Sequence, residues 1–423
     1  MSNTVTAKYQ GRDTSIRLPE DWSLAGIGNP APVEPLTDVG AAVTAALRQP
    51  VGMPGLAVAC AGARTVAIVI DDQTRPTPTA RVLPALLDEL LLAGIPAESC
   101  TIVVGKGTHR WPSEAEVLAK VGPAAASCRV IVHDPDADDQ LTYVGTTSRG
   151  TPVHVNKAVA TADFVVGIGA VVTHYMAGYG GGPKLILPGV SGRQTIIANH
   201  VIARSDDAQQ SRTAGNPLYQ DMLEAAGLAR LAMKIDVVLD MSNAPVGIVA
   251  GSVAQGHQAA ILAYNRVFGF PVAQRADVTI TTGYPLEIEL LQSCKAVLSA
   301  DLSTRDGGAI VLLSACVNGA GPGFGEALAK KPEVPTVWDW IACGKTTPTG
   351  GPMVARVLGV LQRKRVIVVT EGLPADEVRA MGFEHAPSPE AALELLERDY
   401  LVANVFVFPA GAAVNPIPAP VLV

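Results

Sequence analysis

The chain has 423 residues, of which 48% are hydrophobic and only 4% aromatic, and its formal net charge is −7. At about 100–200 residues per domain, this length indicates more than one domain, with ample apolar residues for layered α/β cores. Acidic and basic residues are interspersed, without the basic face that a nucleic-acid-binding protein presents, so we expect no nucleic-acid partner.

The N-terminal residues, MSNTVTAKYQGRD, are polar and lack the apolar core of a secretory signal. No later apolar run approaches the ~20 residues that span a bilayer. We therefore expect a cytoplasmic protein without a membrane partner. The cysteines form no CxxC pair, which favours buried thiols in a reducing compartment over a zinc ribbon. They are Cys60, Cys100, Cys128, Cys294, Cys316 and Cys343.

Short β-branched runs alternate with helical patterns in the first part of the chain. Strands that alternate with helices indicate βαβ units and therefore a parallel sheet. We assign residues 1–272 to an N-terminal α/β domain. Strands are predicted at 65–70, 101–105, 129–134, 163–169 and 234–240, and helices at 80–94 and 112–122.

The strand–helix pattern restarts after FGFPVAQ (268–274), a segment that is typical of a link. We therefore predict a second α/β domain over residues 273–403. The tail, 404–423, is too apolar for a free linker, and we expect it to return and pack on the first domain. The predicted fold class is α/β, with two domains, mostly parallel sheets and an active-site cleft between them.

Polar side chains follow the predicted strands, and ligands of open α/β sheets bind at the carboxyl ends of strands. In TVAIVIDDQTRPTPTA (65–80), the strand ends in Asp71 and Asp72, and Arg75 follows in a proline-stiffened turn. The planar guanidinium of Arg75 suits a carboxylate or a phosphate. The alternative is a structural Asp–Arg pair at the start of the next helix.

The next strand leads into a Gly-x-Gly turn and a histidine. In TIVVGKGTHR (101–110), His109 lies just past the strand. Histidine is the side chain most easily adapted to proton transfer near neutral pH. A lone histidine is also often structural or merely exposed, so this stretch alone leaves both interpretations open.

The most distinctive stretch is HYMAGYGGGPKLILPG (174–189), in which a strand ends at His174 and a glycine run precedes Lys184. It is not a P-loop, because that motif requires Ser or Thr after the lysine and Leu185 follows here. The glycines allow backbone amides to approach a ligand. The lysine amine can contact phosphate or act as a nucleophile.

Two helical segments carry further candidates. SGRQTIIANH (191–200) predicts a helix with His200 near its C-terminal end, where a neutral imidazole can bind a metal or a charged one can face the helix dipole. In TTGYPLEIELLQSCKA (281–296), Gln292 and Lys295 lie three residues apart on one helix face. They suit a cleft, or alternatively a solvated helix surface.

Together these stretches resemble the lactate racemase family in order and spacing, over nearly the whole chain. The resemblance rests on DDQTRPTP (71–78), GKGTHR (105–110), HYMAGYGGGPKLILPG (174–189), NH (199–200) and GYP…LQSCKA (283–296). It implies an isomerase, a racemase or epimerase of a 2-hydroxy acid. It also implies a nickel-pincer nucleotide, a pyridinium mononucleotide whose two sulfur-containing arms and a ring carbon hold nickel, and proteins that build and insert it.

The resemblance assigns roles to matching positions, most of them in a cofactor-binding and catalytic domain at 1–272. Lys184 matches the lysine that tethers the cofactor, and His200 matches the nickel ligand. His109 and His174 match two catalytic bases on opposite faces of the substrate. The remaining matches are Asp72 near the cofactor, Arg75 and Lys295 at the substrate carboxylate and the cofactor, and Gln292 at the substrate.

The chain also departs from the family pattern. Leu291 stands where an aromatic residue is expected, directly before Gln292. Gly350 and Gly351 stand where lactate-specific members carry a bulky aromatic residue near the substrate. Two glycines there would widen the pocket, which indicates a larger 2-hydroxy acid, such as gluconate or another sugar acid, or malate.

Two alternatives belong to other functional classes. A zinc-dependent hydrolase could use His109, His174 and His200 as ligands, although the chain has no HExxH or His-x-His pair and Lys184 would then have no role. A non-catalytic carrier of a sulfur-containing nucleotide would not need two histidines at separate strand ends.

Overall fold

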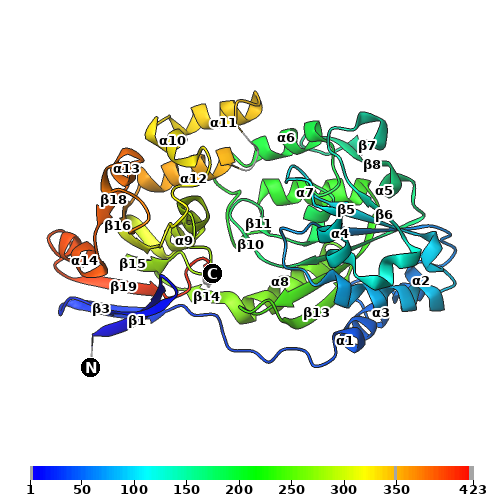
Figure 1. Cartoon of the computed structure of the whole chain (residues 1–423), viewed down its shortest axis with the longest axis horizontal. Coiled ribbons are helices and arrows are strands. Elements are labelled where there is room, and N and C mark those ends of the chain that lie inside the picture. Colours follow the sequence, from blue (N-terminus) through cyan, green and yellow to red (C-terminus); the bar gives the residue numbers. More distant parts are fainter. Residues whose placement is uncertain (1–2, 347–349, 419–423) are drawn as a thin grey trace. The chain divides into compact units, whose positions relative to one another are not determined.

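A computed structural model of the chain describes residues 3–346 and 350–418. The chain divides into two compact units, which we describe separately (Figure 1). The first unit comprises residues 32–267, and the second combines residues 1–31 with residues 268–423.

The first unit is built on a six-stranded sheet in the order β13-β12-β9-β4-β5-β6. All neighbouring strands are parallel except β12 and β13. Each predicted strand is present, with ends shifted by up to three residues. The strands are β4 (Val66–Asp71), β5 (Cys100–Gly105), β6 (Arg129–Val132), β9 (Phe164–Ala170), β12 (Leu231–Leu239) and β13 (Pro245–Gly251).

Helices and two small hairpins surround this sheet. The antiparallel hairpins are β7 (Leu141–Thr146) with β8 (Pro152–Asn156), and β10 (Thr173–His174) with β11 (Gly178–Tyr179). The α-helices are α1 (Val39–Arg48), α2 (Leu56–Ala59), α3 (Thr79–Leu92), α4 (Glu114–Val121), α5 (Lys157–Thr161), α6 (Arg193–Ile202), α7 (Pro217–Leu228) and α8 (Gln255–Phe268). The 3₁₀ turns are η1 (Ala97–Ser99), η2 (Pro123–Ser127), η3 (Asp138–Gln140) and η4 (Gly182–Leu185).

Local sequence explains where several helices begin. Ser113 and Glu116 form a reciprocal capping box at the start of α4. Asn216 caps α7, and Pro217 occupies the first turn, where its missing N–H is not needed. These signals fix helix starts, whereas packing of an apolar face supplies most helix stability.

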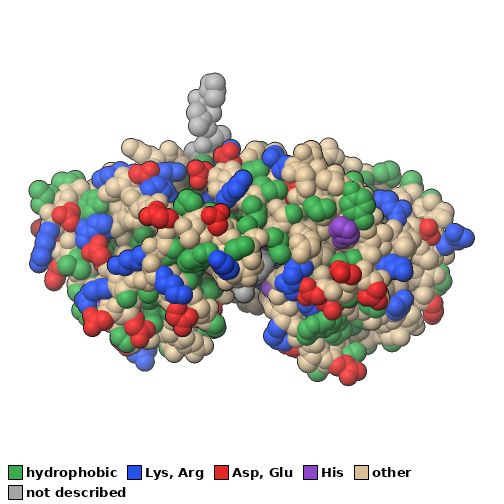
Figure 2. Space-filling view, turned by 90° about the horizontal axis from the view of Figure 1, so that it is seen from above, with side chains coloured by type: hydrophobic (Ala, Val, Ile, Leu, Met, Phe, Trp, Pro, Cys, Tyr) green, Lys and Arg blue, Asp and Glu red, His purple; other side chains and the backbone are tan. Residues whose placement is uncertain are grey.

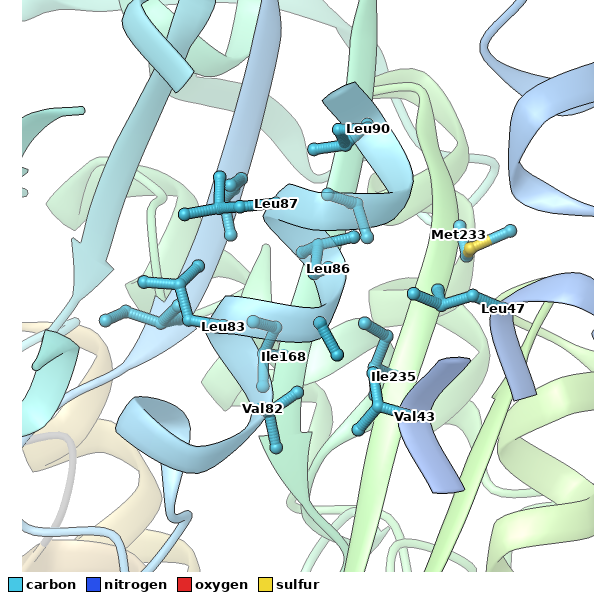
Figure 3. Packing of buried hydrophobic residues seen from close by; sticks show 14 of the residues in the cluster. Val43, Leu47, Val82, Leu83, Leu86, Leu87, Leu90, Ile168, Met233 and Ile235 are labelled. Atoms are coloured by element: carbon cyan, nitrogen blue, oxygen red, sulfur yellow. The ribbon is translucent and has the colours of Figure 1, made fainter. Parts of the chain in front are cut away.

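The main core of the first unit lies between the sheet and helices α1 and α3. Leu83, Leu86 and Leu90 recur on the buried side of α3 at the helical period and are fully buried. Figure 3 shows these leucines along α3, and they belong to the same cluster as Ile168 of β9 and Ile235 of β12. Burial of each aliphatic side chain contributes about 1.5–3 kcal/mol to stability, so this contact holds α3 against the sheet.

The second unit has a six-stranded parallel sheet in the order β18-β17-β16-β15-β19-β3. The strands are β3 (Trp22–Ile27), β15 (Ala276–Thr282), β16 (Thr304–Leu313), β17 (Arg365–Val369), β18 (Glu384–Ala386) and β19 (Ala403–Phe408). A hairpin of β1 (Thr4–Tyr9) and β2 (Arg12–Arg17) packs on it, and β14 (Gly269–Val272) pairs with β20 (Asn415–Pro418). The helices are α9 (Leu290–Ser303), α10 (Phe324–Ala329), α11 (Val334–Ala342), α12 (Gly350–Leu361), α13 (Ala375–Ala380) and α14 (Pro389–Glu397).

The two-unit α/β fold with mostly parallel sheets is confirmed, but its division differs from the expected one. The first 31 residues belong to the second unit, because β3 pairs with β19. The tail, as far as the structure describes it, also belongs to the second unit, because β19 lies between β15 and β3. Hydrophobic periodicity reveals a strand but not its partner, which here is almost 400 residues away in the chain.

The surface and the cysteines agree with most of the compositional expectations. Acidic and basic side chains are interspersed on the face shown in Figure 2. All six cysteines are free thiols; four are buried as expected, whereas Cys128 is half-buried and Cys343 is exposed. No helix within the described ranges is long and apolar enough to cross a membrane.

Candidate active site

Three predicted site residues follow neighbouring parallel strands of the first unit. From β4 the chain moves through β5 and β6 on one side, and through β9 and β12 on the other. The boundary between β4 and β9 is therefore a topological switch point, where open α/β sheets form ligand crevices. Asp72 follows β4, His109 follows β5 and His174 ends the short strand after β9. The sheet thus brings all three to one edge.

Asp72 and His109 form a hydrogen-bonded pair. The carboxylate of Asp72 is 1% exposed, and its Oδ2 lies 2.7 Å from Nδ1 of His109. Its other oxygen accepts from the amide and hydroxyl of Thr74, at 3.0 and 2.6 Å. Burial alone would raise the pKa of Asp72, but the hydrogen bonds from His109 and Thr74 lower it. An ionised Asp72 holds the imidazole proton on Nδ1 and leaves Nε2 as the basic nitrogen.

The loop that carries Arg75 is fixed by a lysine from α4. The ammonium of Lys120 lies 2.6 Å from Oδ1 of Asp71, and both side chains are largely buried. It also donates to the backbone carbonyls of Arg75 and Thr77, at 2.9 and 3.1 Å. Arg75 itself is exposed, so its guanidinium can reach a ligand. The acid that pairs with a cation here is Asp71, and its partner is Lys120 rather than Arg75.

His174 and Lys184 contact each other across the glycine stretch. Nδ1 of His174 accepts from the amides of Met176 and Ala177, at 3.3 and 3.1 Å. The hydrogen of the neutral imidazole therefore sits on Nε2, which lies 3.3 Å from Nζ of Lys184. This contact is favourable when Lys184 is an uncharged amine with a lone pair.

The surroundings of Lys184 favour that uncharged form. Burial, followed by the positive charge of Arg75, lowers the pKa of Lys184 from 10.5 to about 7. A lysine with such a pKa is substantially deprotonated at neutral pH and can act as a nucleophile. Because its charge acts on Lys184, the guanidinium of Arg75 lies close enough to influence the same site.

The glycines of the stretch are required by packing and backbone geometry. Gly181 and Gly182 have φ values of 75° and 51°, in the left-handed region. A Cβ on Gly181 would lie 2.8 Å from Oδ1 of Asp236, and one on Gly182 would lie 2.5 Å from the ring of His257. The amide of Gly182 donates to Asp236 at 3.3 Å. Gly181 and Gly182 therefore lie against the protein's own buried carboxylate, that of Asp236.

His200 lies on α6, two residues before its end, and is 6% exposed. Its Nδ1 donates to the carbonyl of Ile196 at 2.9 Å, which leaves the lone pair on Nε2. Burial, and then the charge of Lys184, lower the pKa of His200 to about 4. His200 is thus held as a neutral imidazole, the form that binds a metal ion.

These residues fit a metal that arrives in an organic chelator better than a bare ion. Within residues 3–346 and 350–418, no three His, Cys, Asp or Glu side chains are grouped so that they could hold a metal ion. His109, His174 and His200 therefore do not form the ligand set of the zinc hydrolase. A neutral imidazole on His200 and a nucleophilic amine on Lys184 are what a tethered metal complex requires from the protein.

The other predicted substrate residues lie in the second unit. Gln292 and Lys295 are half-buried on one face of α9, as their spacing predicts. The wider pocket expected at Gly350 and Gly351 stays a prediction, but Gly351 also has a packing role. A Cβ at Gly351 would lie 2.6 Å from Thr346 and 2.7 Å from Ile341, so this glycine allows α11 and α12 to pack closely.

Sequence reasoning missed four charged or titratable residues around the site. The sequence gives no signal that separates Lys120 from a solvated helix residue, and His257 follows no predicted strand end. Lys234 and Asp236 did carry a signal, because two charges at i and i+2 in an otherwise apolar strand point to the same sheet face. All three of Lys234, Asp236 and His257 are fully buried.

Comparisons with known proteins cover most of the chain. Residues 9–212 match the lactate racemase N-terminal domain, and residues 272–415 match the lactate racemase C-terminal domain. A lactate racemase of Thermoanaerobacterium thermosaccharolyticum is 30% identical over 383 residues, covering 88% of this chain and 89% of the relative. A lactate racemase of Lactiplantibacillus plantarum is 28% identical over 381 residues, with the same two coverages.

Solved structures show the same similarity. The lactate racemase apoprotein of Thermoanaerobacterium thermosaccharolyticum superposes with a TM-score of 0.83 at 27% identity, covering 98% of this chain and 99% of that one. A Thermotoga maritima protein superposes with a TM-score of 0.61 at 16% identity, over 92% of this chain and all of that one, which shows a shared fold alone.

Proposed function

This chain belongs to the lactate racemase family and is an isomerase, and we propose that it racemises or epimerises a 2-hydroxy acid with a nickel-pincer nucleotide. The observation that carries the proposal is the arrangement at the sheet edge of the first unit. There the Asp72–His109 pair and the His174–Lys184 pair follow neighbouring strands.

Two residues of the first unit would hold the cofactor. The neutral imidazole of His200 would bind the nickel through Nε2, and the uncharged amine of Lys184 would form the covalent tether. When bound, the cofactor supplies a reversible acceptor for the hydride of the substrate α-carbon. This chemistry suits a 2-hydroxy acid, because its α-hydrogen is too weakly acidic for easy removal as a proton.

The two histidines would move the hydroxyl proton. Asp72 fixes the tautomer of His109, so Nε2 of His109 can take that proton from one enantiomer. His174 would serve the opposite enantiomer, whose hydroxyl is placed differently. Because Nε2 of His174 carries the hydrogen in this structure, it would release that hydrogen before it takes the hydroxyl proton. Each histidine would also return a proton when the planar 2-keto acid is reduced.

Cationic and polar side chains would orient the substrate. Arg75 and Lys295 would bind its carboxylate and contact the cofactor, with Gln292 beside the substrate and Asp72 near the cofactor. The negative charge of the keto acid would favour its retention between the two half-reactions. The protein would act in the cytoplasm, with cofactor-building and cofactor-inserting proteins as its partners.

The substrate we propose is a 2-hydroxy acid longer than lactate, such as gluconate or malate. Support comes from Gly350, at the first position of α12, where a bulky residue is absent. Turnover of enantiopure lactate, malate and gluconate by one preparation tests this part. A clear preference for lactate would overturn it, without affecting the reaction type.

Racemisation in D₂O tests the reaction itself. If the α-hydrogen moves as hydride and returns, the product enantiomer retains protium at the α-carbon. A mechanism by proton abstraction would introduce deuterium from solvent at that carbon. Mass spectrometry of the product separated on a chiral column distinguishes the two, and α-deuterium in the inverted product would refute the hydride mechanism.

A further inference from the structure

The first unit contains a fully buried group of three charged or titratable side chains that contacts the turn at Gly181–Gly182. Lys234 and Asp236, both on β12, lie 2.9 Å apart through Nζ and Oδ1. His257, on α8, donates from Nδ1 to Oδ2 of Asp236 at 3.0 Å. All three side chains are at most 1% exposed.

Net stabilisation by charge attraction does not explain this group. Removing two charges from water costs several kcal/mol per ion, and buried ion pairs are often replaced by apolar residues without loss of stability. Apolar side chains would therefore serve a purely structural role at least as well. What apolar side chains cannot supply is an acceptor for a neighbouring backbone amide.

The group contacts the turn that presents Lys184. Oδ1 of Asp236 accepts the amide of Gly182, and the amide of Lys184 donates to the carbonyl of Gly181 at 3.1 Å. The ring of His257 lies against Gly182, where even a Cβ would not fit. Asp236 therefore holds the turn through Gly182, and the neighbouring Gly181 accepts a hydrogen bond from the backbone of Lys184.

The neighbouring strand leaves room for this arrangement. A Cβ on Gly167 would lie 3.0 Å from Cδ of Lys234, and one on Gly169 would lie 3.3 Å from its Nζ. The same two positions contact the side chain of Leu185, the residue after Lys184. The glycines of β9 thus let the Lys234 side chain cross that strand under the Lys184 turn.

The ring of His257 fills the space between Gly182 and Tyr219. This imidazole stacks on Tyr219 of α7, with centroids 6.1 Å apart. Its Nε2 is buried without a hydrogen-bond partner in the part of the chain that the structure describes. A proton on Nε2 would therefore be unsatisfied, and the single imidazole proton is held on Nδ1 toward Asp236.

We propose that Lys234, Asp236 and His257 are positioning residues that hold the Gly181–Gly182 turn so that Lys184 keeps the backbone position needed for cofactor attachment. The link to cofactor attachment rests on the proposed function, whereas the holding of the Gly181–Gly182 turn by these residues does not. Asp236 is the central member, because its two oxygens contact the turn, Lys234 and His257.

Two double variants separate positioning from charge balance. Lys234→Met with Asp236→Ala removes both charges and the acceptor, so no uncompensated buried charge remains. Lys234→Met with Asp236→Asn removes the same charges but keeps an oxygen that can accept from Gly182. Lys364→Met is the matched control, since Lys364 is also fully buried in ion pairs, but in the second unit.

Hydrogen–deuterium exchange of the apoprotein gives the first measurement. We expect exchange in the peptide covering 176–187 to rise about tenfold in the Asp236→Ala double variant, the loss of one buried hydrogen bond. The Asp236→Asn double variant restores slow exchange, and Lys364→Met leaves this peptide unchanged. Equal exchange in the two double variants, or faster exchange throughout the first unit, would overturn the proposal.

Nickel content after co-expression with the cofactor-building proteins gives the second measurement. Nickel per chain is expected to fall in the Asp236→Ala double variant and to recover in the Asp236→Asn double variant. If both retain wild-type nickel, the link between the turn and cofactor attachment is wrong. If the wild-type protein itself takes up no nickel, the proposed function fails, and exchange alone decides whether the group holds the turn.

Discussion

Nδ1 of His109 lies 2.7 Å from Oδ2 of Asp72, a carboxylate that is almost completely buried at the end of β4. This contact fixes both the orientation and the tautomer of a histidine that is itself 30% exposed. A histidine held in this way by a buried carboxylate is suited to accept a proton through Nε2. The contact therefore makes a specific kinetic prediction.

Asp72→Asn should lower kcat by about 10²- to 10⁴-fold, the range for loss of general acid–base function. The amide cannot stabilise the charged imidazole and can select the wrong tautomer. Steady-state kinetics with each enantiomer measure the effect. Thr74→Val is the matched control, because it removes one hydrogen bond to Asp72 and keeps the charge. An Asp72→Asn enzyme with normal kcat would exclude this role for the pair.

The two histidines should separate catalysis from metal binding. We expect His109→Ala and His174→Ala each to abolish racemisation and to leave nickel bound, because His200 is the proposed metal ligand. Nickel content of the purified variants and a chiral assay measure the two properties. In His200→Ala, by contrast, nickel itself should be lost, and racemisation should be lost as a consequence. Loss of nickel from either of the first two variants would mean that its role is misassigned.

The low pKa of Lys184 predicts a pH-dependent gain in stability. In the unfolded chain Lys184 keeps its proton up to a pKa of 10.5, whereas in the folded chain it loses the proton near pH 7. Between these values the unfolded state binds more protons, so raising the pH favours the folded state. Lys184→Met cannot titrate and should lack this gain.

Urea unfolding of both proteins at about pH 6 and about pH 9.5 measures this difference, since other groups cancel in the comparison. The free energy of unfolding of the wild type, relative to Lys184→Met, should increase with pH. A constant difference would show that Lys184 has an ordinary pKa. Lys157→Met, at an exposed lysine, is the control that should follow the wild type.

Lys120→Met should weaken substrate binding without direct contact to substrate. The lysine holds the carbonyls of Arg75 and Thr77 and neutralises Asp71, so its loss frees the loop that carries Arg75. We expect KM to rise by about tenfold, more than kcat falls, together with a loss of about 3–5 kcal/mol of stability. Lys120→Arg, which keeps the charge, should restore most of the stability. An unchanged KM would contradict this account.

The position of the site could be predicted from sequence because strand ends in a parallel sheet share an edge. Asp72, His109 and His174 each follow a β-branched run, so their types and spacing were visible before their distances were known. The His174–Lys184 contact spans ten residues within one glycine-rich stretch. Such local relationships are constrained by chain geometry.

Long-range partners could not be predicted in the same way. The pairing of β3 with β19 joins opposite ends of the chain, and no periodicity encodes it. Lys120 gave no sign of its partner Asp71, because a lysine in a helix is usually solvated. The packing role of Gly351 was equally hidden, because its neighbours across α11 and α12 are known only from the fold.

The most direct test of the central claim is the intact mass and nickel content of the protein made with the cofactor-building proteins. The account predicts an added mass that peptide mapping assigns to Lys184, together with bound nickel and racemase activity, and an inactive apoprotein when those proteins are omitted. Racemase activity in nickel-free protein, or activity restored to the apoprotein by zinc alone, would contradict it.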